Sequence, residues 1–131
     1  TVMSFKARLK VAGKELPVLA CDYSLMQETD ATGRPSSITR GGKIHVTVES
    51  TGDTAFFEWM VNPFERKEGS VVYSKRDSDA TLKELKFKDA YLVDYFEQFG
   101  STGDSPVTET FTISAKEIEL GNGKHTNEWP D

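Results

Sequence analysis

The stretch VTETFTISAKEIEL, residues 107–120, places its apolar side chains at odd positions up to Ala115 and at even positions from Ile118 onward. Alternation with a period of two is typical of a β-strand with one buried face. The change from odd to even means that the same face stays buried only if the strand contains a bulge or a bend near Lys116. Bends of this kind help a sheet to curl into a barrel. The stretch therefore predicts a long, curved strand.

Six other segments show strand patterns, at residues 5–11, 16–25, 44–49, 70–75, 82–87 and 90–99. In 5–11 and 44–49 apolar and polar residues alternate, which predicts strands with one buried face. In 16–25 and 90–99 apolar residues fall on both faces, which predicts that both faces are covered. About seven short strands with one helix indicate a mainly β fold, an antiparallel barrel or sandwich. The tail 121–131 is rich in glycine and polar residues and is expected to be irregular.

One helix is predicted from Thr54 to about Val61. Asp53 can accept hydrogen bonds from the free amides of its first turn, and Asn62 precedes Pro63, which disfavours the helical conformation. Only a narrow polar stripe interrupts its apolar surface, so the helix is expected to be contacted from two sides. The stripe is Thr54, Glu58 and Asn62, and the apolar residues include Phe56, Phe57, Trp59 and Met60. We expect Phe56 and Trp59 to hold the helix to the barrel, whereas the second contact is either the barrel's own end or a different chain.

Length and charge limit the class of protein. The 131 residues fit one domain, taken as 3–131, with Thr1 and Val2 as additions before a native start at Met3. A net charge of −5, with 16 basic against 21 acidic residues, argues against sequence-independent binding of nucleic acid. The beginning of the chain lacks the apolar segment of a signal peptide, and no apolar run approaches about 18 residues, so we expect a cytoplasmic protein without membrane insertion. Cys21, the single cysteine, lies in an apolar run where a buried, inert thiol is expected.

A search for reactive groups finds no site. His45 and His125 lack partners at ligand spacing, so a zinc site is not expected. Asp77 and Asp79 begin like a calcium loop, but Leu82 stands where that loop needs glycine. We therefore predict no catalytic, cofactor-binding or metal-binding residue and no enzyme.

Residues 26–43, MQETDATGRPSSITRGGK, form a polar connection that is too long for a hairpin turn. Ser36 and Ser37 within it lack the strand-turn-helix setting of a nucleophile. The connection could be an idle insertion, the helix could cap a barrel end, and a small barrel buries both faces of some strands. All three features would also be explained by protein surface outside the monomer, which favours self-assembly. Trp129 in the tail either packs on its own domain or contacts a neighbour.

Four strings of the sequence resemble the divergent TssD branch of the Hcp family, the tube protein of bacterial type VI secretion systems. They are CDYSLMQETDATGRPSS, GGKIHVTVEST with Asp53 close behind, KRDSDATLKELKFKDAYLV and SAKEIELGNGKHTNEWPD. The resemblance implies a compact β-barrel of two antiparallel sheets with one short helix and an extended loop. It also implies hexameric rings that stack into a tube inside a contractile sheath, and a tube that carries a spike and effectors out of the cell without a signal peptide or a cofactor.

The same resemblance implies a role for the extended loop, which in the family reaches from one ring toward the next. The residues that this assigns are Thr29, Asp30, Gly33, Arg34, Pro35, Ser36, Ser37 and Arg40. The polar members would pair with the next ring, while Gly33 and Pro35 would shape the loop. A monomeric barrel that binds a small ligand is the alternative, and it would need an open pocket and a single-chain mass in solution.

Overall fold

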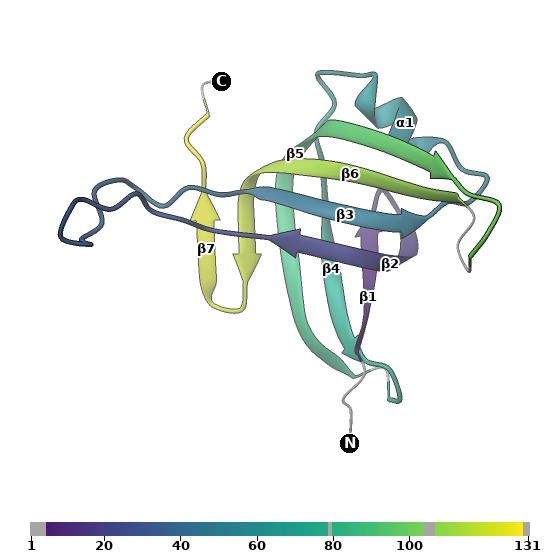
Figure 1. Ribbon diagram of the computed structural model, residues 1–131, viewed down its shortest axis with the longest axis horizontal. Coiled ribbons are helices and arrows are strands. Elements are labelled where there is room, and N and C mark those ends of the chain that lie inside the picture. Colours follow the sequence, from purple (N-terminus) through teal and green to yellow (C-terminus); the bar gives the residue numbers. More distant parts are fainter. Residues whose placement is uncertain (1–4, 79, 104–106, 130–131) are drawn as a thin grey trace.

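In residues 5–78, 80–103 and 107–129, which the computed structural model describes, the chain forms seven β-strands and one α-helix (Figure 1). In chain order they are β1 Phe5–Val11, β2 Lys14–Tyr23, β3 Lys43–Glu49, α1 Ala55–Met60, β4 Lys67–Lys75, β5 Thr81–Phe99, β6 Val107–Leu120 and β7 Gly123–Thr126. Thr1, Val2, Met3 and Asp79 lie outside the described residues, as does the end of the chain after Trp129.

The strands form a closed barrel with one extra strand. Their order is β3-β2-β1-β4-β5-β6-β7, and pairing of β3 with β6 closes the circle, leaving β7 outside it. Every pairing between these strands is antiparallel. The mainly β fold with an antiparallel barrel is therefore confirmed.

Two long strands bend together and connect the two halves of the barrel. The buried face of β6 changes between Ala115 and Ile118, and that of β5 changes between Phe87 and Ala90. The pairing of β5 with β6 keeps its register across this point, so neither strand slips against the other. Asp89 marks the turn in β5 with a φ of 50°, a region that few residues other than glycine adopt. The bend expected near Lys116 is confirmed, and Figure 1 shows both ribbons changing direction there.

Two expectations about the strands were wrong, and a third is met only in part within the single chain. The segments 82–87 and 90–99 are parts of one strand, β5, which continues through the bend. The tail expected to be irregular contains β7, which pairs with the end of β6 after a tight turn at Gly121, whose φ is 60°. The cover expected on both faces of 16–25 and 90–99 is incomplete within the single chain, where Leu19 is 50% exposed and Phe96 is 57% exposed.

The interior of the barrel is filled by side chains from the strands and by two residues of α1. Phe56 and Trp59 are buried, and the ring of Phe56 stacks on that of Phe111 with centroids 4.3 Å apart. The helix is shorter than expected and begins at Ala55, whose amide donates to the Asp53 carboxylate at 2.9 Å. With six residues α1 is the only helix in the described ranges, and no helix there is long and apolar enough to cross a membrane.

Candidate assembly interface

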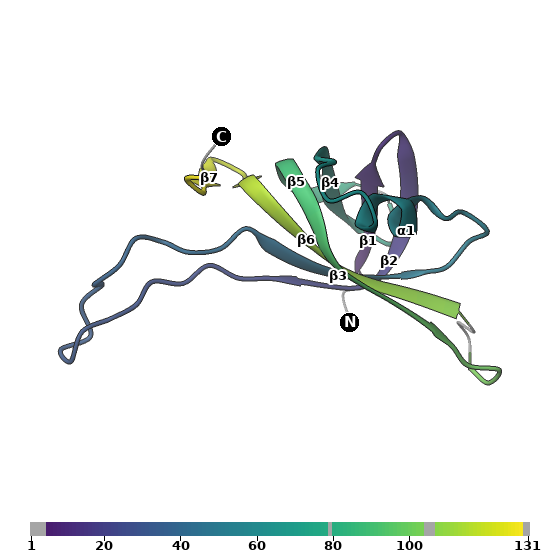
Figure 2. The same cartoon turned by 90° about the horizontal axis from the view of Figure 1, so that it is seen from above.

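The connection between β2 and β3, residues 24–42, is a two-stranded arm rather than an open loop. Met26 and Arg40 exchange backbone hydrogen bonds of 2.9 and 2.7 Å, and the amide of Ser36 donates to the carbonyl of Glu28 at 2.7 Å. Figure 2 shows both chain segments leaving the barrel on one side and running outward together. The chain itself therefore holds the arm in an extended shape.

The tip of the arm is built around Asp30. Its Oδ1 accepts hydrogen bonds from the amide and hydroxyl of Thr32 at 2.9 and 2.7 Å and from the amide of Arg34 at 3.2 Å. These hydrogen bonds, led by that of the Thr32 hydroxyl, lower the pKa of Asp30 below its ordinary value because they stabilise the charged form. Gly33 supplies the left-handed residue of the turn, with a φ of 87°.

The predicted loop residues divide into those that build the arm and those that remain available. Ser37 accepts from the amide of Glu28 at 2.8 Å, and Arg40 lies 3.8 Å from the Glu28 carboxylate. The guanidinium of Arg34 and the hydroxyl of Ser36, by contrast, have no partner in the described part of the chain. Asp30, Ser37 and Arg40 thus maintain the arm's own structure, while Arg34 and Ser36 can meet another molecule.

Two strand edges of the barrel are open within the described residues. β1 pairs with β2 only as far as Val18, so residues 19–23 have β3 on one side and no strand on the other. β4 pairs with β5 only as far as Ala90, so residues 91–99 have β6 on one side and no strand on the other. Both edges belong to the same four-stranded arrangement, β2-β3-β6-β5. Exposed edges of this kind are ready to pair with another chain.

Exposed apolar side chains gather beside these edges. Leu19 lies at the first edge, and Phe96 and Phe99 lie at the second. Beside the second edge α1 presents Phe57, whose ring meets Tyr95 edge-on at 6.0 Å, and Val61, also exposed, follows at the end of the helix. A monomer seldom leaves several large apolar groups together in water. One side of α1 thus packs against the barrel of its own chain, and the other side is exposed to solvent in the single chain.

The outer face of β3 and β6 is polar. Along β6 the residues that alternate with the buried Phe111 and Ile113 carry hydroxyl groups. With Thr47 of β3 they form what we call the hydroxyl face, namely Thr47, Thr108, Thr110, Thr112 and Ser114. The hydroxyls of Thr47 and Thr110 are hydrogen-bonded at 3.1 Å.

The remaining candidates from the sequence have structural partners. His45 Nδ1 lies 2.7 Å from the Asp22 carboxylate, and the ring of Trp129 lies 5.5 Å from that of Tyr91. Cys21 is only partly buried and accepts a hydrogen bond from a tyrosine hydroxyl at 3.5 Å, and burial raises the pKa of its thiol. In the described ranges no three His, Cys, Asp or Glu residues are placed to hold a metal ion.

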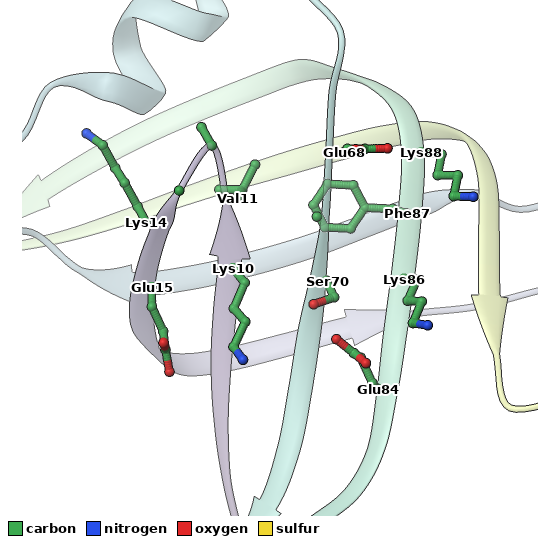
Figure 3. Close-up of a pocket in the computed structure, with 13 residues that line it drawn as sticks. Lys10, Val11, Lys14, Glu15, Glu68, Ser70, Glu84, Lys86, Phe87 and Lys88 are labelled. Carbon is green, nitrogen blue, oxygen red and sulfur yellow. The ribbon is translucent and has the colours of Figure 1, made fainter.

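One groove lies on the outer surface of the barrel. It has a volume of about 550 Å³ and crosses β1, β4 and β5. Around Ser70 its walls carry the charged side chains of Lys10, Glu84 and Lys86, of mixed sign (Figure 3). A ligand pocket is usually enclosed and mostly apolar with a few convergent polar groups. This open groove does not have that form.

Comparison with known proteins identifies the family. The model of the hemolysin coregulated protein Hcp (TssD) family matches residues 3–130. The structure of Hcp1 from Flavobacterium johnsoniae is 58% identical, covers 93% of this chain and 99% of that chain, and has a TM-score of 0.90. The chain belongs to the Hcp (TssD) family. Hcp proteins are the tube proteins of type VI secretion systems and are in general not enzymes, so the predicted function as a tube subunit is confirmed.

More distant structures share the Hcp fold. Hcp1 from Salmonella typhimurium is 15% identical with a TM-score of 0.75, covering 95% of this chain and 93% of that chain. A sheath-tube complex of an extracellular contractile injection system is 16% identical with a TM-score of 0.59, covering 92% and 90%. At these identities the likeness concerns the fold alone. A comparison with curated proteins found no match.

Proposed function

We propose that six copies of this Hcp chain, each acting as one domain over 3–131, close into a ring, and that the rings stack into the tube of a type VI secretion system. The observation that supports this most directly is the pair of open edges, residues 19–23 and 91–99, at opposite sides of one four-stranded sheet. The tube carries a spike and effectors outward when its sheath contracts. The chain itself catalyses nothing and binds no cofactor.

Two different edges on one subunit favour a closed ring. When edge 91–99 of one copy meets edge 19–23 of the next, every copy uses a different surface on each side, and such head-to-tail contacts close into a ring if the rotation allows. Closure pairs the edge of every copy and leaves none in water. The same contact covers Leu19, Phe96 and Phe57, which are exposed in the single chain.

The direction of ring closure assigns the hydroxyl face to the channel. The inner face of the four strands is occupied by each subunit's own core, including Ile44, Phe111 and Ile113. If the sheet closed with these cores on the inside, the bodies of six subunits would have to share the centre of the ring. The cores therefore lie outside, and the hydroxyl face lines the channel. Such a wall presents hydroxyl groups along β3 and β6, with Phe96 of β5, the partner of Thr110, on the same face.

The arm joins one ring to the next in this proposal. It is folded in the single chain and extends beyond the barrel (Figure 2), so it loses little conformational freedom when it docks. Arg34 and Ser36 are the groups that its own structure leaves available. Rings assemble in the cytoplasm, and the protein leaves the cell through the apparatus.

Electron microscopy and light scattering of the purified protein test the ring. We expect six-fold rings, and a single-chain mass at micromolar concentration without rings would contradict the proposal and favour the monomeric ligand-binding alternative.

Arg34→Glu tests the arm, since it replaces a five-donor cation by an acceptor-only group. Rings should persist while stacking and secretion fall. Arg76→Glu, the same charge change at an exposed turn between β4 and β5, is the matched control. Equal stacking of parent and Arg34→Glu would remove the role given to the arm.

A further inference from the structure

The C-terminal segment after β7 reaches the base of the arm through Asn127. Its side-chain Nδ2 donates to the carbonyl of Gly41 at 2.9 Å and to that of Ala115 at 3.1 Å, while its backbone amide donates to the carbonyl of Lys116 at 2.7 Å. Gly41 belongs to the arm and Ala115 to β6. One residue near the end of the chain therefore connects the arm to the barrel.

The position of Asn127 follows from the bend in β6. The pairing of β3 with β6 continues to the hydrogen bond from the Ala115 amide to the Gly42 carbonyl, 2.8 Å long. In that register Gly41 would face Lys116, but β6 has turned away by then, and the Lys116 carbonyl is taken by the Asn127 amide. The Asn127 side chain bridges the two segments at this point, where it is the donor to the Gly41 carbonyl and also bonds the Ala115 carbonyl.

The crossing is too tight for another residue at the base of the arm. A Cβ atom on Gly42 would lie 2.5 Å from Asn127 Nδ2 and 2.6 Å from the Ala115 carbonyl oxygen, and Gly42 has a φ of 101°. A Cβ atom on Gly41 would lie 2.3 Å from the side chain of Leu25. The two glycines let the amide approach the backbone, but they also form the least restricted part of the arm.

The side-chain amide of Asn127 is held in one orientation. Two carbonyl oxygens face its Nδ2, and only the NH₂ group can donate to both. On the other side Oδ1 lies 3.0 Å from His125 Nε2, which donates to it as an N–H. His125 belongs to β7, so the strand that pairs with β6 also orients the amide.

We propose that Asn127 is the positioning residue of the arm, and that β7 thereby makes ring stacking depend on the C-terminal segment of the chain. The inference rests on the proposed function for its consequence, though not for its geometry. From Gly42 to the tip at Arg34 the arm spans about 26 Å at about 3.3 Å per residue. A pivot of about 10° at the two glycines would move the tip by about 4–5 Å, which is more than the length of a hydrogen bond. An arm that lost this contact would remain folded but would miss its partner.

Asn127→Asp tests the proposal because it keeps the size of the side chain and replaces both Nδ2 donors by an oxygen that repels the two carbonyls. Asn122→Asp, the same change at the exposed turn before β7, is the matched control. Spin labels at Ala31→Cys and Lys83→Cys, in a Cys21→Ser background, report the distance from the arm to the barrel, and electron microscopy reports rings and tube length.

We expect Asn127→Asp to form rings like the parent, to broaden the distance distribution, and to shorten tubes at least ten-fold, whereas Asn122→Asp should match the parent in all three. Gly42→Ala should broaden the distribution in the same way by pushing the amide aside. If Asn127→Asp does not fold, Asn127→Ser makes the same test without a new charge. A distribution as narrow as the parent's in the Asn127 variants would overturn the proposal, whatever the tube length. If the parent forms no rings, the proposed function fails, and the distance measurement still decides the role of Asn127.

Discussion

Two neighbouring phenylalanines of α1 offer a matched pair of substitutions. Phe56 is 5% exposed and stacks on Phe111, whereas Phe57 is 53% exposed and meets the ring of Tyr95 edge-on. Phe56→Ala and Phe57→Ala make the same chemical change one position apart, and both alter helix propensity alike. Their effects should therefore differ only through what each ring contacts.

The expected magnitudes follow from burial. Removal of a buried phenylalanine ring costs about 3–5 kcal/mol of unfolding free energy, which includes the cavity that is left. The ring of Phe57 is already half in water, and an edge-on aromatic contact is worth about 0.5–1.5 kcal/mol, so Phe57→Ala should cost about 1 kcal/mol. We expect the two variants to differ by about 2–4 kcal/mol, equivalent to a factor of about 30 or more in the unfolding equilibrium.

Urea denaturation followed by tryptophan fluorescence measures this difference, since Trp59 lies beside the substituted residues in a buried position. The measurement has to be repeated over a range of protein concentrations, because association stabilises folded subunits by mass action. Ring formation is then compared by light scattering, where Phe57→Ala should be the more damaging of the two among folded molecules. Equal losses of unfolding free energy would show that the two faces of α1 are wrongly assigned. Normal rings from Phe57→Ala would show that its outer face is not an interface.

Three further tests use other substitutions. Trp59→Ala should lower the unfolding free energy by about 3–5 kcal/mol, whereas Glu58→Ala, on the exposed polar stripe, should change it by less than about 1 kcal/mol in the same denaturation experiment. Burial, with the hydrogen bond to a buried carboxylate, raises the pKa of Tyr95 above its ordinary value of about 10. Tyr95 ionises at lower pH in the unfolded chain than in the folded one, so its contribution to the unfolding free energy is full below about pH 10 and is lost above it. Tyr95→Phe should therefore lose less unfolding free energy at alkaline pH. At neutral pH the same variant should be about 1–2 kcal/mol less stable, because the buried carboxylate loses its hydrogen-bond donor. Gly33→Ala should strain the tip of the arm by about 1–2 kcal/mol and speed its amide hydrogen exchange, whereas Gly52→Ala, at a position without a positive φ, should leave that exchange unchanged.

The parts of the fold that sequence could predict are those set by local patterns. Alternation in 44–49 corresponds to a strand whose alternate residues are buried, because side chains on a strand point to opposite faces in turn, and in 5–11 the same holds for Leu9 and Val11. The odd-to-even change near Lys116 likewise marks the bend, since the core stays on one side of the strand. The helix was recognisable because Asp53 can accept from the free amides of its first turn and because Asn62 before Pro63 disfavours its continuation.

The parts that sequence could not predict depend on partners far along the chain. β7 has no apolar alternation, and backbone pairing with β6 holds it in place. Asn127 shows no motif, and its partner Gly41 is 86 residues away. The continuity of β5 was missed because Lys88 and Asp89 interrupt the apolar pattern where the strand bends, and only the neighbouring β6 shows that pairing continues.

Irregularities in the strands explain how one short chain both closes a core and presents edges for assembly. Beyond the bend at Asp89, β5 leaves β4 and keeps only β6, which exposes the edge 91–99. On the other side β2 leaves β1 after Val18, where its pairing with β3 also shifts register, and this exposes the edge 19–23. A barrel whose strands kept both neighbours along their whole length would have no free edge. Its sheet would then offer no unpaired backbone groups for association with another chain. The bend also turns β6 away from the base of the arm. There the side chain of Asn127, from the C-terminal segment, bonds the carbonyl of Gly41. The same departures from regular pairing thus produce the open strand edges and the support of the arm, and under the proposed function a sequence that removed them would build a closed monomer.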